Sequence, residues 1–351
     1  MTGVTRRAAV SLLGAVTASV AANAEARPVA QFYKGRQITM VVGTAPGGIN
    51  DISARFVARY LGKYIPGQPR IVVENQPGAG GITSANRLAN VYPQDGSVIA
   101  KLERAVPLLA IQGDPNVHFD PQRLTWLGSL SSYANDAYLM LVMATSPIKS
   151  ASELKEPGKS ITLGGDNAAS SNVIYATIAK DILSLHVKVV SGYTGAAPLF
   201  LAMQSGEIDG QVVGYSSVRT GQRGLWSRHA FRALMQFGRK TRHPDFAGIP
   251  TAYELTTDPT ARALLNFADL QFFISLPFAA PPNVPADRAM ALQTAFMNMC
   301  RDPGVIAAAQ ALGIDMSPID GAAVRAAIAT AAATPRTVID RYNKLVGPAR
   351  H

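Results

Sequence analysis

The sequence has little cysteine and little histidine, and both shortages exclude kinds of site. Cys300 is the one cysteine in 351 residues, so neither an intramolecular disulfide nor a cysteine-rich metal site can form within the chain. The five histidines, at positions 118, 186, 229, 243 and 351, are isolated and lack the spacing of metal ligands. We therefore expect no metal site, and a fold that packing alone stabilises.

Long apolar runs are also absent after the first 26 residues. The Ala-rich stretch 321–334 is interrupted by Arg325, and no other segment is long and apolar enough to span a bilayer. The 33 Lys and Arg residues against 23 Asp and Glu give a net charge of +10, but the basic residues are scattered and lack interleaved aromatics. This pattern is typical of a solvated surface, so we expect no nucleic-acid partner.

The first 26 residues are typical of a secretory signal peptide. Arg6 and Arg7 precede an apolar run from Ala8 to Ala22, and small residues follow it. The run is too short to cross the ~30 Å of a bilayer core. We expect cleavage near Ala24 or Ala26 and export to the periplasm, by the Sec route rather than the twin-arginine route, which residues 5–10 match only loosely.

The rest of the chain repeats one rhythm: a short β-branched run, a glycine-rich turn and a helical segment. Residues 38–42 begin the first such unit, 70–73 begin the second, and the pattern restarts with 138–143. This alternation predicts mostly parallel sheets that helices cover on both faces. About 325 residues also exceed what one core organises, which favours two domains.

We therefore predict an α/β fold with two lobes and a ligand cleft between them. Residues 27–129 and 251–351 are expected to form the first lobe, which is discontinuous, and residues 130–250 the second. The Ala-rich helices near the C-terminus are expected to complete the first lobe.

Four small-residue loops join a strand to a helix, at 43–51, 75–83, 164–172 and 192–198. Ligands of open α/β sheets bind at this edge. Each helix start exposes unpaired N–H groups and the positive end of its dipole, and both favour anions. Each loop alone could be an ordinary turn, and Asp51 and Asp166 could be helix caps or ligand acceptors. Four such loops facing one another predict a carboxylate site.

Signatures of catalysis and of nucleotide binding are incomplete. The sequence from Gly78 to Thr83 lacks the third glycine of a dinucleotide fingerprint, and the next strand ends at Lys101 rather than at an acid. The stretch from Gly214 to Val218 lacks the second glycine of a nucleophile elbow, so Ser216 is interpreted as a turn or pocket residue. We expect no catalytic residues and no cofactor.

At these loops the chain resembles the solute-binding receptors of tripartite tricarboxylate transporters, the TctC or Bug family. Each piece is short, but their order and spacing hold over nearly the whole mature chain. The matching pieces lie at 42–51, 73–81, 93–96, 192–198, 206–209, 232–234, 249–254 and 280–285. The chain departs from the family pattern at Gly43-Thr44, at Ser97 and at Ser191-Gly192.

The resemblance implies a type II periplasmic-binding-protein fold and delivery of a small organic carboxylate to a membrane transporter by a monomeric receptor. It also implies a ligand held by backbone amides and ordered waters. The implied ligand-binding residues are Thr44, Ala45, Gly47, Gly48, Asp51, Gly80, Gly81, Asp166, Asn167, Ser170, Tyr193, Gly195, Ala196 and Ala197.

Two other functions stay open from the sequence. An exported α/β hydrolase would need a nucleophile and a base in the cleft, and a receptor for a sensor kinase would present its liganded form without transport. The residues also leave open whether the ligand is citrate-like, a dicarboxylate, an amino acid or an aromatic acid. We expect a bulky residue at Gly48 or Gly81 to block the pocket without unfolding the protein.

Overall fold

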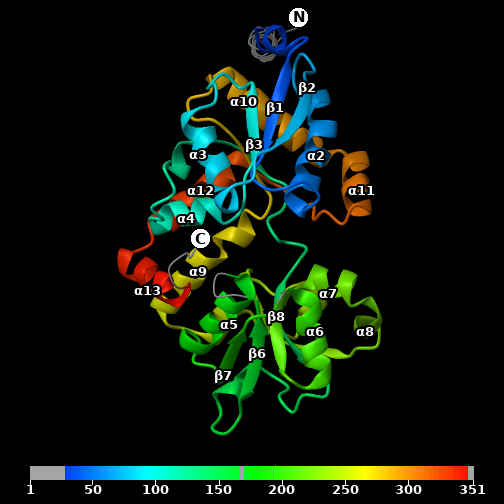
Figure 1. The fold of residues 1–351 in the computed structure, drawn as a ribbon, viewed down its shortest axis with the longest axis vertical. Coiled ribbons are helices and arrows are strands. Elements are labelled where there is room, and N and C mark those ends of the chain that lie inside the picture. The colour runs from blue at the N-terminus through cyan, green and yellow to red at the C-terminus, as the bar shows by residue number, and fades with distance from the viewer. Residues whose placement is uncertain (1–27, 167–169, 194, 347–351) are drawn as a thin grey trace, which may run out of the picture.

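The computed structural model describes residues 28–166, 170–193 and 195–346, within which the chain forms two β-sheets flanked by helices (Figure 1). The first sheet has the strand order β11-β4-β10-β3-β1-β2. Strands β1, β2 and β3 are parallel, and β10 is antiparallel to β3 and β4. The bounds are β1 Gln37–Val42, β2 Arg70–Asn75, β3 Val98–Lys101, β4 Thr125–Ser129, β10 Pro277–Ala280 and β11 Ile319–Asp320.

The second sheet has the order β7-β6-β8-β5-β9. Strands β7, β6 and β8 are parallel, and β5 is antiparallel to β8 and β9. Both sheets thus have an antiparallel strand in the fourth position, β10 when the first is counted from β2 and β5 when the second is counted from β7. The first sheet ends in a further antiparallel strand, β11, which pairs with β4. The bounds are β5 Tyr138–Met143, β6 Ile161–Gly165, β7 Val187–Ser191, β8 Gly210–Gly214 and β9 Phe231–Phe237.

The helices fall into three groups. The first group surrounds the first sheet: α2 Ile49–Leu61, α3 Ile82–Asn90, α4 Val106–Gln112, α10 Ala286–Arg301, α11 Pro303–Ala311 and α12 Gly321–Ala332. The second group surrounds the second sheet: α5 Ser171–Asp181, α6 Ala196–Ser205, α7 Tyr215–Gly221 and α8 Arg223–Ser227. The third group lies between the sheets: α9 Pro259–Phe273 and α13 Arg336–Val346. Short 3₁₀ turns occupy Gly62–Tyr64, Ala79–Gly81, Pro121–Arg123, Ser152–Lys155, Pro244–Phe246 and Ala252–Leu255.

The central strands are buried on both faces, as their sequence predicts. Along β1, Ile38, Met40 and Val42 pack in one apolar cluster while Val41 faces another. This is the period of two that a strand imposes on its side chains. The helices begin where local chemistry allows: Asp258 accepts hydrogen bonds from two amides of the first turn of α9, and Pro259 needs no partner there.

The two lobes are joined by the chain segments that cross between them, near Leu130 and Leu276, and by apolar packing around helices α9 and α13. The amide of Leu130 donates to the carbonyl of Leu276 at 3.0 Å, so the outgoing and returning segments pair with each other. Helix α9 packs against α4, α12 and α13, and α13 also contacts α5. Phe267 and Tyr342 form an edge-to-face pair with ring centroids 5.2 Å apart. One side of the space between the lobes is therefore filled by α9 and α13 (Figure 1).

The predicted two-lobed α/β architecture is confirmed, and strand 138–143 has the predicted bounds. Strands β4, β10 and β11 were not predicted. The apolar run from Leu270 to Phe278 contains the end of α9 and the start of β10, because an apolar run has no period that separates helix from strand. Among the described residues, no helix is long and apolar enough to cross a membrane.

Candidate solute-binding site

The four predicted loops follow the parallel strands β1, β2, β6 and β7 and lead toward helices α2, α3, α5 and α6. Because parallel strands share a carboxyl edge, each pair of loops lies at one edge of its sheet. The edges face each other, since one cavity is lined by Gly80 and Glu103 from the first lobe and by Ser171 from the second. Tyr138 also interacts electrostatically with Arg104 of the first lobe and Asp166 of the second.

The loop after β1 is exposed, and its backbone conformation depends on glycine. Ala45, Gly47 and Gly48 are exposed, and Gly47 has a φ of 96°, which favours glycine. Gly48 is the N-cap of α2, and nothing lies within 4 Å of the position a Cβ would take there. Thr44 Oγ1 is buried without a hydrogen-bond partner in the described part of the chain. The loop thus presents backbone amides together with one unsatisfied hydroxyl.

Asp51 lies in the first turn of α2 and is 3% exposed. Its carboxylate accepts hydrogen bonds from the Gly47 amide at 2.9 Å, from Arg55 Nε at 3.0 Å and from Asn75 Nδ2 at 2.9 Å. Burial alone would raise the pKa of Asp51, but these donors and the charge of Arg55 together lower it. Asp51 therefore holds the loop in place, and Asn75 fixes the same loop by donating to the Thr44 carbonyl at 3.0 Å.

The loop after β2 touches the first loop closely. A Cβ on Gly43 would clash with Ser84 Oγ and lie 2.9 Å from Gly81 Cα. Gly80 has a φ of 61° and open space beside it, whereas Gly81 has a φ of 91° and a Cβ there would lie 2.6 Å from Glu103 Cγ. The expectation that Gly81 tolerates a bulky residue is therefore wrong, because both its backbone and its neighbour exclude a side chain. Gly48 has neither restriction.

The loop after β6 is held by Asn172. Its Oδ1 accepts from the Ser170 hydroxyl, from the Val173 amide at 2.8 Å and from the Asp166 amide at 3.3 Å. Ser170 is the N-cap of α5. Asp166 Oδ1 is buried without a hydrogen-bond partner in the part of the chain that is described. Asn167, which was also predicted, lies outside the described residues.

The loop after β7 is tied to the previous one, because the Gly192 amide donates to the Asp166 carbonyl at 2.7 Å. Gly195 is the N-cap of α6 with a φ of 109°, and Ala196 and Ala197 form the start of that helix. Ala197 is exposed. Tyr193 donates its hydroxyl to Glu207 Oε1 at 2.6 Å, so this hydroxyl is engaged within the second lobe.

Two basic residues at the end of β3 were missed as site residues. Lys101 is 0% exposed and donates to Asn50 Oδ1 and to the Leu102 carbonyl, both at 2.7 Å. Burial lowers the pKa of Lys101 to about 8, with a smaller raising effect from Glu103 and a lowering effect from Arg104. Within the described residues neither Lys101 nor Arg104 forms an ion pair. Asn50 belongs to α2, so Lys101 places a desolvated positive charge behind the first loop.

The described residues contain no group of three or more His, Cys, Asp or Glu side chains that could hold a metal ion. Ser216 donates its hydroxyl to Asp136 Oδ2 at 2.6 Å and its amide to Asp136 Oδ1 at 3.1 Å. Asp136 lies in the segment that enters the second lobe, so these bonds anchor the start of α7 beside the crossing.

A family model described as the tripartite tricarboxylate transporter family receptor, TctC, matches residues 53–343. The chain belongs to this family. As a TctC-family chain it is a solute-binding receptor, and proteins of this family are periplasmic binding proteins.

Two curated relatives of this TctC-family chain are both named UPF0065 proteins. It is 26% identical over 292 residues to a UPF0065 protein of Bordetella pertussis, covering 79% of this chain and 83% of that protein. It is 31% identical over 175 residues to a UPF0065 protein in the gbd 5′ region of Cupriavidus necator. That alignment covers 47% of this chain and 51%, about half, of the relative.

Solved structures share the fold. A TctC solute-binding protein from Polaromonas has a TM-score of 0.69 at 19% identity, covering 88% of this chain and 99% of that one. The periplasmic binding protein BugD has a TM-score of 0.55 at 18% identity, with 89% and 98% covered. An R. palustris protein solved with adipate has a TM-score of 0.56 at 18% identity, with 89% and 98% covered. The predicted periplasmic-binding-protein fold is thereby confirmed.

Proposed function

We propose that this receptor binds one small organic carboxylate between its two lobes. The observation that carries the proposal is Lys101, a fully buried ammonium without an ion-pair partner in the described chain, behind an exposed loop of backbone amides. An isolated buried charge is costly, and an anion bound in front of the loop would offset that cost. The adipate bound by a structural neighbour supports the same ligand class.

Within this proposal the predicted site residues take two roles. Main-chain groups of Ala45, Gly48, Gly80, Gly195, Ala196 and Ala197, with the side chains of Thr44 and Asp166, face the solute. The remaining residues shape the loops, because their side chain or backbone is committed to neighbours: Gly47, Asp51, Gly81, Ser170 and Tyr193. The lobes, 27–129 with 251–351 and 130–250, close on the solute about the paired crossing segments.

The route and partners of the receptor follow from its N-terminus and its family. We propose export through the Sec pathway with removal of residues 1–26, and action in the periplasm as a monomer. The liganded form would then deliver its solute to the membrane subunits of a tripartite tricarboxylate-type transporter. The N-terminal residue of the secreted protein and its mass in solution test the first two points.

We further propose that the receptor releases its solute unchanged. A serine hydrolase needs a base that accepts the proton of the serine hydroxyl, usually a histidine. The Ser216 hydroxyl is instead bonded to the Asp136 carboxylate, with no histidine between them. We expect the bound acid to be recovered unchanged after long incubation with the protein. Conversion of the acid into another compound would contradict the proposal.

Calorimetric titration of the purified protein tests carboxylate binding. The panel is succinate, malate, citrate, adipate, glutamate and benzoate, each matched by its neutral amide. At least one acid should bind with one site per chain and stabilise the protein by about 2.7 kcal/mol at a hundredfold excess over its Kd. The amides should not bind. Equal binding of acid and amide, or no binding by any acid, would refute the proposal.

The variant Lys101→Met tests whether the buried charge of Lys101 contributes to binding. Methionine fills the same space without charge, so folding should persist while the affinity for the acid falls about tenfold or more. Lys188→Met, on the exposed face of β7, is the matched control and should leave affinity unchanged. If both variants bind as the original protein does, the buried charge has no part in recognition.

A further inference from the structure

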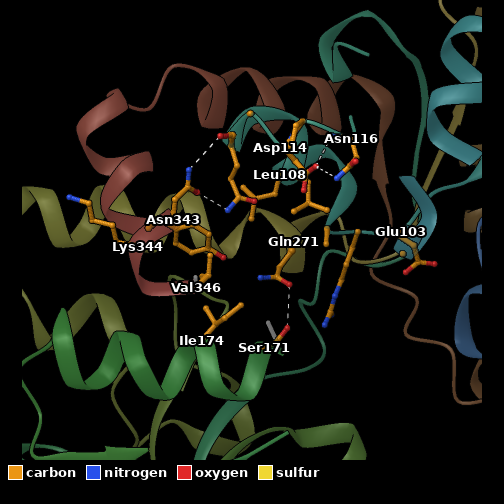
Figure 2. A pocket seen from close by; sticks show the side chains of 18 residues that line it. Glu103, Leu108, Asp114, Asn116, Ser171, Ile174, Gln271, Asn343, Lys344 and Val346 are labelled. Carbon is orange, nitrogen blue, oxygen red and sulfur yellow. Dashed lines mark hydrogen bonds between the residues drawn. The ribbon is translucent and has the colours of Figure 1, made fainter. Parts of the chain in front are cut away.

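A cavity of about 750 Å³ lies beside the glycine loops, between the two lobes and the C-terminal helix (Figure 2). Gly80 and Glu103 line it from the first lobe, Ser171 from the start of α5, and Asn343 from α13. Of the predicted site residues that the structure describes, only Gly80 lines it. The cavity therefore extends the space between the lobes from the loops toward α13, where the far end of a long solute would lie.

Apolar side chains from three helices line this cavity. Leu108 and Leu109 come from α4, Ile174 from α5 and Val346 from α13. Figure 2 shows Leu108, Ile174 and Val346 around the same space. Cavities of roughly 300–1,000 Å³ with mostly apolar walls and a few polar groups are typical of sites for drug-sized ligands. A four-carbon diacid would leave these walls in contact with water.

Charged residues of both signs line this cavity: Glu103, Asp114, Arg104 and Lys344. Lys344 is exposed on α13, whereas Arg104 lies against an aromatic ring. Its guanidinium carbon lies 5.0 Å from the centroid of the Phe272 ring, an arrangement that orients the planar group without neutralising it. The side chain is only partly buried and has no ion-pair partner among the described residues. A guanidinium presents parallel N–H groups that match both oxygens of a carboxylate.

Glu103 adds an acceptor. Its Oε1 is buried and lacks a hydrogen-bond partner within the described chain, although the side chain lines the cavity. Buried acceptors in folded proteins nearly always receive a donor. A hydroxyl or amino group on the solute would satisfy this oxygen.

We propose that this cavity is a second subsite, which takes the apolar body and the distal acidic group of an organic acid longer than adipate. Arg104 pairs with the distal carboxylate, Glu103 accepts from a hydroxyl or amino substituent, and α4, α5 and α13 enclose the body. The inference rests on the proposed function, in which the glycine loops hold the first carboxylate.

A length series of acids tests the subsite. Binding of succinate, adipate, suberate, sebacate and 1,4-phenylenediacetate is measured by calorimetry, with octanoate as a long acid that lacks the distal charge. Affinity should increase from succinate to sebacate. Arg104→Gln should weaken suberate and sebacate about tenfold or more and leave succinate and octanoate unchanged. Arg301→Gln, exposed at the end of α10, is the matched control and should change nothing.

Ile174→Phe is a second variant that narrows the cavity without removing charge. It should weaken sebacate and 1,4-phenylenediacetate while succinate binds as before. If succinate binds as tightly as sebacate, or if Arg104→Gln weakens all acids equally, the second subsite is refuted although carboxylate binding stands. Absence of binding by every acid in the series would instead refute the proposed function.

Discussion

The side-chain amide of Asn75, the last residue of β2, donates a hydrogen bond of 2.9 Å to Asp51 Oδ1 in the first turn of α2. The two residues are 24 positions apart, and each also bonds to the loop that lies between β1 and α2. This loop is exposed, yet its conformation is determined by side chains beneath it. If the solute binds at this loop, as we propose, the amides there are already fixed before it arrives, which lowers the entropic cost of binding.

Asp51→Ala should loosen the first loop. It leaves the Gly47 amide and the Asn75 amide without their buried acceptor, so the free energy of unfolding should fall by about 1–3 kcal/mol and acid affinity should fall with it. Denaturant unfolding and calorimetry measure the two effects. Arg59→Ala, exposed on the same helix, is the control. Unchanged affinity in Asp51→Ala would show that the loop does not need this support.

Gly48→Leu and Gly81→Ala should have opposite effects. A Cβ at Gly48 meets no protein atom within 4 Å, so the fold should remain stable while acid binding is lost. Gly81 has a φ of 91°, and a Cβ would lie 2.6 Å from Glu103 Cγ. This variant should be destabilised by about 1–3 kcal/mol. Thermal unfolding with and without ligand measures both, and a stable Gly81→Ala would contradict the geometry.

Lys101 should make stability and affinity respond oppositely to alkaline pH. Burial lowers the pKa of Lys101 to about 8, below its value in the unfolded chain, so the unfolded state binds more protons between pH 8 and about 10.5. The free energy of unfolding should therefore increase over this range, by about 3 kcal/mol from this group.

Acid affinity should decrease over the same range, because the ammonium charge is lost. The charged groups facing Lys101 are Glu103 and Arg104. Denaturant unfolding and calorimetry from pH 7 to about 10.5 measure the two trends. Lys101→Met should show neither trend, and an affinity independent of pH in the original protein would exclude a role for this charge.

Asp269 should make the protein less stable at neutral pH than at mildly acidic pH. Its carboxylate is buried on α9 and accepts from Tyr175 and Tyr253 at 2.7 and 3.0 Å. Burial raises the pKa of Asp269 to about 6, above its unfolded value, so the folded state binds more protons between about pH 4 and 6. The contribution of this group should be present below about pH 4 and should fall by about 3 kcal/mol as pH rises through 6.

Asp269→Asn should remove that slope, and its amide oxygen keeps an acceptor for one of the two tyrosines. Denaturant unfolding from about pH 4 to about pH 8 measures it, and Asp181→Asn on the exposed end of α5 is the control. An unchanged slope in Asp269→Asn would assign the pH dependence to other groups.

The fold was largely predictable because its signals are local. The alternation of β-branched runs and glycine turns predicts β1, β2 and β5, since each needs only neighbouring residues to be recognised. Strand β10 is different, because Pro277–Ala280 gains its partners from β3 and β4, far away in the sequence. No local pattern encodes such a pairing.

The candidate site was predictable only in part for the same reason. Glycine loops can be recognised from their composition. The hydrogen-bond partners of Asp51 cannot, because they lie in three different segments: α2, the loop before it and β2. Lys101 carries no sign in the sequence that it is fully buried, since lysine at a strand end is usually exposed. The cavity beside α13 depends on where this last helix packs, and its own sequence does not specify its partners.

The position of β10 in the sequence also determines when the first lobe can complete its fold. This strand lies between β3 and β4 and completes their sheet, but its residues, Pro277–Ala280, come after the whole second lobe in the chain. A growing polypeptide therefore cannot finish its N-terminal core while it is being synthesised, and formation of that core waits for nearly the full length. In the proposed export through the Sec pathway, such late completion would keep the chain unfolded enough to pass the translocation channel, and the core would then form in the periplasm.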